Sequence, residues 1–379
     1  MTRLTINILL ILGHVLTLTP AAYAAEKDDS AALRRIIAQK IIVGFFGRKN
    51  TDPDFQRVLK NLEQGFVGGV LFLARNISNR TDLEIMVREV KNCRCSVPPL
   101  IAIDEEGGVV ERLGETQGFS HTDSAAEVGR EREEKARTDY ERLAKKLSEI
   151  GFNMNLAPVV DLNLNPTNPI IGHLGRSFSG SPEVVSRYAA IFIEEHHKRG
   201  IATALKHFPG HGSSSNDSHE SIANVETSWS PAELVPYDNL IHLNIADSIM
   251  VGHLANALRW GGVATQYGSS AIEQMLRKQL KFEGVVLSDD LSMRAVHSPT
   301  QPFSDVVRSS VRAGVDIVIV SRVNDDEMFD TGEFTNSAIL AGVLVGEIDR
   351  AAINASVKRI ENLRKEIADG FGSRPNLRK

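Results

Sequence analysis

Short apolar runs and longer amphipathic stretches alternate along most of this chain of 379 residues, and this alternation constrains the fold more than any other feature. The apolar runs cover residues 40–45, 68–73, 100–104, 155–162, 201–208, 248–253, 284–289 and 315–320. Patterns typical of helices lie between them, for example at 131–150, 182–199, 230–240, 269–280 and 302–313. Strands that alternate with helices predict parallel βαβ units, and eight such units favour an α/β fold with a single closed (β/α)8 barrel of the TIM type.

The alternative fold is an open, doubly wound sheet, which has less support because no glycine-rich phosphate loop follows the first strand. Length alone allows two domains, but no linker, repeat or low-complexity block divides the chain. We therefore expect one barrel domain over residues 25–379, opened by a short helix at 29–39. A last helix at about 348–368 precedes a tail rich in Gly, Pro, Arg and Lys, which we expect to be disordered from about 370.

Residues 1–24 have the features of a secretory signal peptide. Arg3 supplies a positive charge, residues 6–18 are mostly apolar, and Ala22-Tyr23-Ala24 fits the small-x-small pattern of a cleavage site. We therefore expect cleavage after Ala24 and an exported chain, periplasmic or secreted. An uncleaved N-terminal anchor is the alternative, although the apolar stretch is short for a membrane span of about 20 residues. No other segment is apolar enough to cross a membrane.

Charge and cysteine content narrow the possible partners. The net charge is −5 with no basic block, which argues against a nucleic-acid partner. The cysteines, Cys93 and Cys95, are too few for a structural zinc site, which needs four ligands. In an exported protein they could pair with each other, and two free thiols on a loop edge are the alternative. We expect no metal and no other cofactor, and the sequence leaves the oligomeric state open.

One stretch concentrates ionisable side chains at the end of the fifth apolar run. Lys206 and His207 end this run, and a polar loop then carries Asp217 and His219. In a barrel of this kind the active site forms where the strands end and the βα loops begin. A surface loop with incidental histidines is the alternative. Three His, a Lys and an Asp within fourteen residues favour a functional site.

The third and fourth runs also end in charged residues. Asp104 ends the third run, and the paired glycines just after it allow a tight turn that leaves its carboxylate facing the barrel mouth, with Arg112 close behind. A solvated acidic turn is the alternative. After the fourth run, Asp161 suits a structural role as well as a functional one. Arg176 ends the following loop, and its planar guanidinium could bind hydroxyls or a carboxylate.

The seventh run ends in two adjacent acids, Asp289 and Asp290. Adjacent residues on a strand point to opposite faces, so only one of them can point at the barrel centre. Asp289 suits the chemistry, and Asp290 suits an N-cap of the helix expected to follow. His253, at the end of the sixth run, is equally consistent with a wall residue and with a ligand contact.

These strand ends indicate a reaction class. They show no metal-ligand spacing, no Gly-x-Ser-x-Gly elbow and no reactive cysteine. A carboxylate such as Asp289 opposite a proton donor such as His219 instead predicts glycosyl transfer to water by a double displacement. An imidazole with a pKa near about 6.5 can act as both acid and base around neutral pH, and Asp217 could stabilise its charged form.

Four segments together resemble the family 3 glycoside hydrolases, in their single-domain β-N-acetylglucosaminidase (β-hexosaminidase) branch. They are Ile103-Asp104-Glu105-Glu106-Gly107-Gly108 with Arg112, Gly175-Arg176-Ser177-Phe178, Lys206 to Gly212 with Asp217-Ser218-His219, and Ser288-Asp289-Asp290-Leu291-Ser292-Met293. The resemblance covers nearly the whole expected mature chain, and the Asp-Ser-His element marks this branch. It implies that Asp289 is the nucleophile and that His219 is the general acid/base, oriented by Asp217. It also implies that the sugar is bound by Asp104, Arg112, Arg176, Lys206 and His207.

The expected function is therefore a retaining exo-β-N-acetylglucosaminidase that removes terminal N-acetylglucosamine from peptidoglycan fragments or chitooligosaccharides. Many relatives act in the cytoplasm, so the predicted signal peptide implies a substrate outside it. A β-glucosidase or glycoside phosphorylase of the same family is one alternative, because a histidine acid/base does not repel an incoming phosphate as a carboxylate does. A non-catalytic protein that binds wall glycans is the other.

Overall fold

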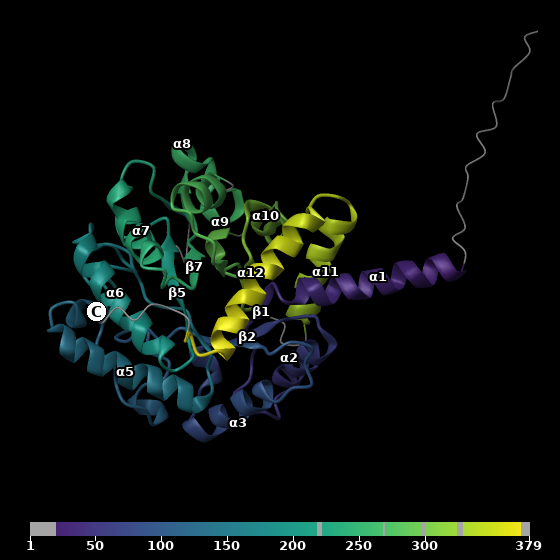
Figure 1. Cartoon of the computed structure of the whole chain (residues 1–379), viewed down its shortest axis with the longest axis horizontal. Helices are drawn as coiled ribbons and strands as arrows, with labels where there is room; N and C mark the ends of the chain where they lie inside the picture. The colour runs from purple at the N-terminus through teal and green to yellow at the C-terminus, as the bar shows by residue number, and fades with distance from the viewer. Residues whose placement is uncertain (1–19, 218–221, 268–269, 297–299, 324–328, 373–379) are drawn as a thin grey trace, which may run out of the picture.

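Eight parallel strands close into a barrel in this computed structural model, which describes residues 20–217, 222–267, 270–296, 300–323 and 329–372 (Figure 1). The strand order is β1-β11-β10-β7-β5-β4-β3-β2. The bounds are β1 Ile41–Val43, β2 Gly69–Phe72, β3 Leu100–Ile103, β4 Met154–Asn155, β5 Ala202–Phe208, β7 Ser248–Val251, β10 Val285–Asp290 and β11 Ile317–Val320. Each strand overlaps one of the eight apolar runs, so the predicted TIM-type barrel is confirmed.

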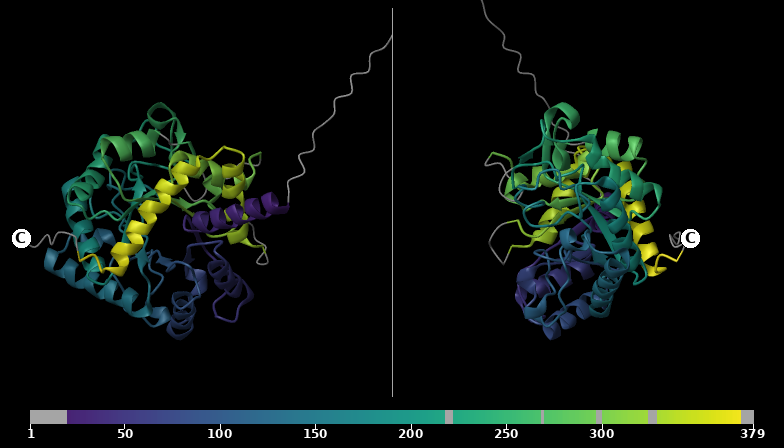
Figure 2. Two further views of the ribbon diagram at one scale, coloured as in Figure 1. Left: turned by 45° about the vertical axis from the view of Figure 1, so that its right-hand side comes forward. Right: turned by 90° about the vertical axis from the view of Figure 1, so that its left-hand side faces the viewer.

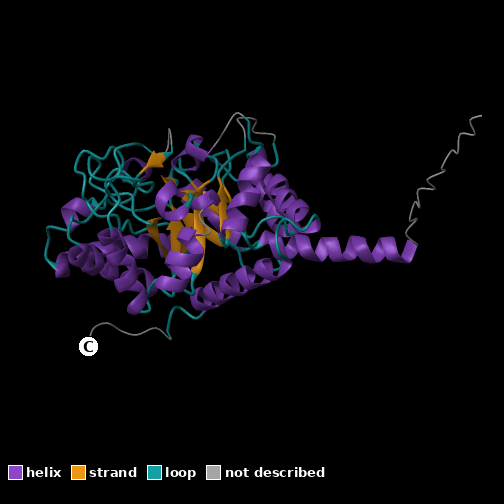
Figure 3. Ribbon diagram, turned by 90° about the horizontal axis from the view of Figure 1, so that it is seen from above, coloured by secondary structure: helices purple, strands orange, loops and turns teal. Residues whose placement is uncertain are grey.

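Helices surround the strands on all sides (Figure 3). The longer ones are α1 Pro20–Ala38, α2 Pro53–Gln64, α3 Arg80–Lys91, α5 Glu133–Ile150, α6 Pro182–His197, α7 Val235–His242, the π-helix η4 Ser270–Gln279, α10 Phe303–Ala313, α11 Thr331–Leu344 and α12 Arg350–Ala368. Local signals define their ends. For example, the Ser181 hydroxyl caps α6 by accepting a hydrogen bond from Val184 N–H, and Gly65 ends α2 in the left-handed conformation.

The hydrophobic core has two layers, one inside the barrel and one between the barrel and its helices. In β2, Leu71 points into the barrel while Val70 and Phe72 pack outward against the helices. This alternation explains why the strands read as continuous apolar runs, since both faces of a parallel strand are buried. Ile360 and Leu363 of α12 belong to the inner layer. Helix α12, yellow in Figure 2, therefore covers the end of the barrel opposite the ends of the strands that carry the predicted site.

Several predicted boundaries were wrong. The fourth strand was expected at 155–162, but β4 is only Met154–Asn155. The chain beyond it stays beside β5 with irregular pairing, in which Ala204 N donates to Ala157 O at 2.9 Å and Val160 N to Lys206 O at 2.8 Å. Pro158 has no N–H to contribute to a regular ladder. The first helix begins at Pro20 rather than at residue 29, and the helix predicted at 230–240 is split into the 3-10 helix η3, Pro231–Leu234, and α7.

Two domain predictions concern the ends of the chain, namely the signal peptide at residues 1–24 and the disordered tail from about residue 370. Residues 1–19 and 373–379 lie outside the described residues, so the signal peptide remains a prediction. The Phe371 ring is buried and stacks on His197 with ring centroids 4.1 Å apart, so the packed chain reaches past residue 370. Within the described residues, none of the helices has the length and apolar character that a membrane crossing requires.

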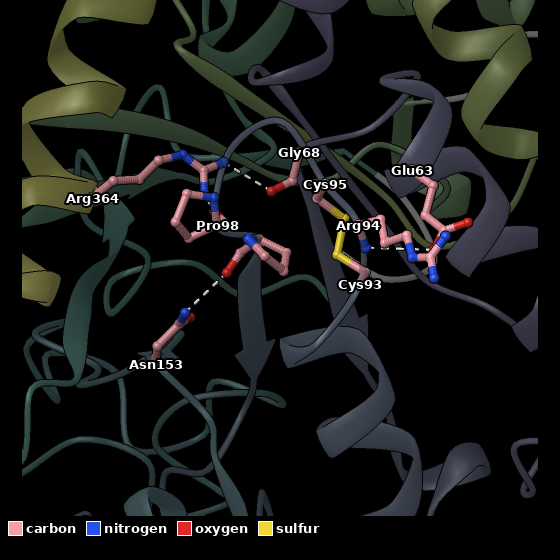
Figure 4. Close-up of a disulfide and its surroundings, with 9 residues drawn as sticks. Glu63, Gly68, Cys93, Arg94, Cys95, Pro98, Asn153 and Arg364 are labelled. Atoms are coloured by element: carbon pink, nitrogen blue, oxygen red, sulfur yellow. Dashed lines mark hydrogen bonds between the residues drawn. A yellow bond between two sulfur atoms is a disulfide. The ribbon is translucent and has the colours of Figure 1, made fainter.

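Cys93 and Cys95 form a disulfide with a Cα–Cα distance of 5.3 Å (Figure 4). It lies in the turn between α3 and β3, ahead of the first residue of that strand. Of the two states that the sequence left open, the structure has the paired one. Because the turn leads into the N-terminal end of β3, the disulfide lies away from the strand ends where the predicted site forms.

Candidate active site

A pocket of about 380 Å³ opens at the C-terminal ends of the barrel strands. Its charged and polar lining comprises Asp104, Glu106, Arg112, Arg176, Lys206, His207, Asp289 and Asp290. Its floor is apolar, since Leu71, Leu156, Met250 and Ile319 line the pocket and also belong to the core inside the barrel. The structure therefore brings six of the eight predicted site residues into one pocket, from strands and loops far apart in the sequence.

Lys206 is the central cation of this pocket. Its Nζ lies 2.7 Å from Asp104 Oδ1 and 2.6 Å from Glu106 Oε1, and the side chain is almost fully buried. Burial alone would lower the pKa of Lys206, but the Asp104 and Glu106 carboxylates raise it above its usual value. Lys206 is therefore charged at neutral pH and holds Asp104 in place at the tip of β3.

Arg176 is fixed by Glu106, a residue to which the sequence analysis gave no role. Nε and Nη2 of Arg176 donate to Oε2 and Oε1 of Glu106, both at 2.8 Å, and Nη1 donates to Ile170 O at 3.0 Å. Although burial opposes ionisation of Glu106, the charges of Arg176 and Lys206 hold its pKa well below the usual range. Two buried cations need a buried counter-charge, but the sequence alone does not show that Arg176 and Lys206 are buried.

Asp161 orients His207. The Nδ1 atom of the His207 ring lies 2.7 Å from Asp161 Oδ2, and the same carboxylate accepts hydrogen bonds from the backbone N–H groups of His207 and His211. Burial alone would raise the pKa of Asp161, but the neighbouring His207 keeps it below its usual value. Of the two roles considered for Asp161, the structure shows the structural one, since it fixes the segment that follows β5.

Asp289 lines the pocket from the tip of β10, and its Oδ1 accepts a hydrogen bond from the Asp290 N–H at 2.8 Å. Asp290 does not cap a following helix as predicted. Its Oδ1 accepts hydrogen bonds from the N–H groups of Ser292 and Ser321, both at 2.9 Å, so it ties the end of β10 to the end of β11. The chain forms a turn after Asp290, and the short 3-10 helix Arg294–Val296 begins later.

His253 is a wall residue rather than a ligand contact. It is fully buried, its ring Nδ1 lies 2.8 Å from Thr265 Oγ1, and its Nε2 lies 3.0 Å from Asp290 O. Burial lowers the pKa of His253, so the ring is neutral. Both ring nitrogens are therefore engaged inside the protein.

Arg112 reaches the pocket from a loop that a buried ion pair holds. The Glu105 carboxylate accepts hydrogen bonds from the backbone N–H groups of Arg112 and Leu113 at 2.6 and 3.1 Å. The Nζ of Lys146, on α5, binds Glu105 at 2.9 Å and also donates to Leu113 O. Glu105 and Lys146 therefore shape the loop after β3, and this places Arg112 at the pocket wall.

The two predicted acid/base residues are located only in part. Asp217 is half-buried on the loop after β5, whereas His219 lies outside the described residues. In the part of the chain that the structure describes, no group of three or more His, Cys, Asp or Glu side chains could hold a metal ion. The ionisable groups that line the pocket are carboxylates, cations and the imidazole of His207.

A family model described as "Glycosyl hydrolase family 3 N terminal domain" matches residues 33–363. The chain is 30% identical to a beta-hexosaminidase of Xylella fastidiosa over 82% of this chain and 94% of that protein. It is 29% identical to beta-hexosaminidase A of Pseudoalteromonas piscicida over 81% of this chain, but it spans only about half of that protein's length, 54%.

Solved structures show the same likeness. A glycoside hydrolase family 3 beta-N-acetylglucosaminidase from Paenibacillus aligns with a TM-score of 0.80 and 30% identity, over 91% of this chain and 64% of that one. A beta-N-acetylhexosaminidase from Beutenbergia cavernae aligns with a TM-score of 0.77 and 25% identity, over 88% of this chain and 98% of that one. The resemblance on which the sequence analysis relied is therefore confirmed, and the chain belongs to the glycosyl hydrolase family 3.

Proposed function

We propose that this chain is a retaining exo-β-N-acetylglucosaminidase. The observation that carries the proposal is the position of Asp289, whose carboxylate lines the same pocket as Asp104, Lys206 and Arg176. A double displacement at an anomeric carbon requires a nucleophilic carboxylate at the bound sugar, and hydrogen bonds to the sugar hydroxyls stabilise its transition state further. The names of the matched relatives, beta-hexosaminidase and beta-N-acetylglucosaminidase, support the N-acetylglucosamine specificity.

In this mechanism Asp289 attacks the anomeric carbon and forms a covalent glycosyl-enzyme. His219 donates a proton to the leaving oxygen and then takes a proton from the water that releases the sugar, so the anomeric configuration is retained. Asp217 stabilises the imidazolium form and sets the ring tautomer.

The cluster around Lys206 binds the sugar in the same proposal. The Asp104 carboxylate accepts hydrogen bonds from sugar hydroxyls, and Lys206, Arg176, Arg112 and His207 supply donors from the other walls. Because Lys206 and Arg176 already have carboxylate partners, their charges are fixed in position before substrate arrives. The closed apolar floor leaves no path for a glycan to continue through the barrel, which favours removal of a terminal residue.

The test measures release of nitrophenol from nitrophenyl β-N-acetylglucosaminide and from the matching glucoside, with wild type and Asp289→Ala. We expect turnover of the first substrate by wild type and loss of it in the variant, at an unchanged melting temperature. Asp369→Asn, at the exposed end of α12, is the matched control and should retain activity. Intact activity in Asp289→Ala would remove the central assignment, and preference for the glucoside would favour the β-glucosidase alternative.

The natural substrate and the location belong to the same proposal. We infer a glycan outside the cytoplasm, either peptidoglycan fragments or chitooligosaccharides, because residues 1–24 have the pattern of a signal peptide. Rates on the two glycans separate these substrates, and a rate that rises with added phosphate would indicate a phosphorylase. The N-terminal residue of the exported protein tests cleavage, which we expect after Ala24.

A further inference from the structure

The loop after β5 has a rigid stem. Residues 210–214 are all buried, although the sequence of this stem is polar and glycine-rich. A side chain has no room at Gly212, where a Cβ atom would lie 1.7 Å from Leu162 O. The stem precedes Asp217, so its position sets where the predicted acid/base pair begins.

Glu233, on the 3-10 helix η3, forms hydrogen bonds to this stem from one side. Its Oε2 accepts a hydrogen bond from Gly212 N–H at 2.9 Å, and its Oε1 accepts one from the Ser213 hydroxyl at 2.6 Å. Gly210 packs directly on the same side chain, since a Cβ there would lie 2.5 Å from the Glu233 Cβ. Glu233 is completely buried and does not line the substrate pocket.

The loop after β4 forms hydrogen bonds to the stem from the other side. Asn165 Nδ2 donates to Ser214 O at 2.9 Å, and Asn168 Nδ2 donates to His211 O at 2.8 Å. On the far side of the loop, the chain returns through β6, Ala223–Asn224, which pairs in parallel with β8, Leu254–Asn256. The segment with Asp217 therefore starts and ends at anchored backbone, and the Glu233 carboxyl group is the anchor at its start.

We propose that Glu233 is a positioning residue for general acid catalysis, because through Gly212 and Ser213 it holds the start of the loop that carries Asp217. The inference rests on the proposed function. Glu233 touches neither the pocket nor a reacting atom, so its effect must pass through the stem. Burying a carboxyl group is costly unless it is hydrogen-bonded, and the hydrogen bonds of Glu233 to another segment of the chain go to this stem.

The hydrogen-bond pattern predicts which substitutions of Glu233 preserve its contacts to Gly212 and Ser213. In Glu233→Gln the amide oxygen can accept from Gly212 N–H while the amide NH2 donates to the Ser213 hydroxyl, so both contacts survive. Glu233→Asp is one methylene shorter and cannot reach both groups. Glu233→Ala removes both contacts and leaves the Gly212 N–H and the Ser213 hydroxyl buried without this partner.

The experiment measures kcat/KM on N-acetylglucosaminides with different leaving groups, because only poor leaving groups need the general acid. For Glu233→Ala and Glu233→Asp we expect kcat/KM to fall about tenfold or more with an alkyl or sugar leaving group, since a positioned acid contributes about 10²–10⁴-fold. With a dinitrophenyl leaving group we expect less than about a threefold fall, and Glu233→Gln should stay near wild type on both substrates.

A control variant and the contrary results decide whether Glu233 is a positioning residue. Glu195→Gln removes another buried carboxylate, which pairs with Arg137 and Lys198 away from the pocket, and should show no dependence on the leaving group. An equal fall on both substrates in the Glu233 variants would overturn the inference in favour of a merely structural role. If Glu233→Ala does not fold, Glu233→Asp gives the same comparison. Absence of turnover in the wild type would instead reject the proposed function.

Discussion

Glu106 and Arg176 join two loops of the pocket through parallel hydrogen bonds of 2.8 Å, although they are 70 residues apart in the chain. Glu106 also lies 2.6 Å from Lys206, so one carboxylate neutralises two buried cations. With Asp104 on the other side of Lys206, the four side chains form one connected charge network. The network keeps its donors and its acceptor in fixed places at the pocket wall, which is the preorganisation that transition-state binding needs.

Glu106→Gln should destabilise the protein and weaken substrate binding together. The substitution leaves Arg176 and Lys206 buried with less counter-charge, and breaking a buried ion pair costs about 3–5 kcal/mol. We expect a lower melting temperature and a higher KM, measured by thermal unfolding and by steady-state kinetics. Unchanged stability in this variant would contradict the role of Glu106 as the shared counter-charge.

Asp104→Asn should affect activity far more than stability. The Asp104 side chain is 18% exposed, and Lys206 keeps Glu106 as a partner when the Asp104 charge is removed. Hydrogen bonds to charged groups contribute about 1.5–3 kcal/mol each, so loss of the carboxylate should lower kcat/KM about 100-fold. The comparison with Glu106→Gln serves as the control, since that variant should lose stability as well. A drop in melting temperature as large as that of Glu106→Gln would show that Asp104 is mainly structural.

The fold and part of the site could be predicted because their signals are local. A strand buried on both faces reads as an apolar run, and the C-terminal ends of such strands converge on one mouth, so Asp104, Lys206 and Asp289 could be placed together from their positions in the runs. The end of the fourth strand could not be predicted. Pro158 indicates that a regular ladder cannot continue, but the way the segment then pairs with β5 depends on the tertiary fold.

Glu106 and Glu233 show what local patterns cannot supply. Glu106 is the last of three consecutive acids, and nothing near it in sequence indicates that Arg176, from a distant loop, is its partner. Glu233 follows Ser230 and Pro231, so it reads as an ordinary acid in the first turn of a helix. Its partners Gly212 and Ser213 precede it by 21 and 20 residues, and only the tertiary fold brings them together.

The pH dependence of stability should reveal the buried Glu233 carboxyl. Burial raises the pKa of Glu233 from the ordinary value of 4.5 to about 7, and the nearby Asp161 adds to the effect. Between these values the folded protein binds more protons than the unfolded chain, so this group's contribution to stability is greatest below pH 4.5 and is lost as pH rises through 7. The difference corresponds to roughly 3 kcal/mol.

Glu233→Gln removes this titration while keeping both hydrogen bonds. We therefore expect the variant to gain stability relative to wild type as pH rises, so that it is the more stable protein at about pH 8 and nearly equal to wild type at about pH 4. Urea unfolding at several pH values measures the difference. Other buried groups, such as His211, titrate in both proteins and cancel in the comparison. A constant difference across this range would mean that Glu233 keeps an ordinary pKa in the folded protein.

Reduction of the Cys93–Cys95 disulfide should lower stability slightly and leave catalysis unchanged. The two cysteines are separated by two positions, so the bond closes a very short loop and restricts the unfolded chain little. The chain-entropy relation gives about 1–2 kcal/mol for a ring of this size.

The bond precedes β3, at the end of the barrel opposite the pocket, so kcat and KM on the N-acetylglucosaminide should be equal with and without dithiothreitol. The variant with both cysteines replaced by serine is the matched control, and its melting temperature should not respond to the reductant. If reduction lowered kcat in the wild type and the double variant showed the same lower kcat with and without the reductant, the turn before β3 would be coupled to the pocket through the strand, contrary to this expectation.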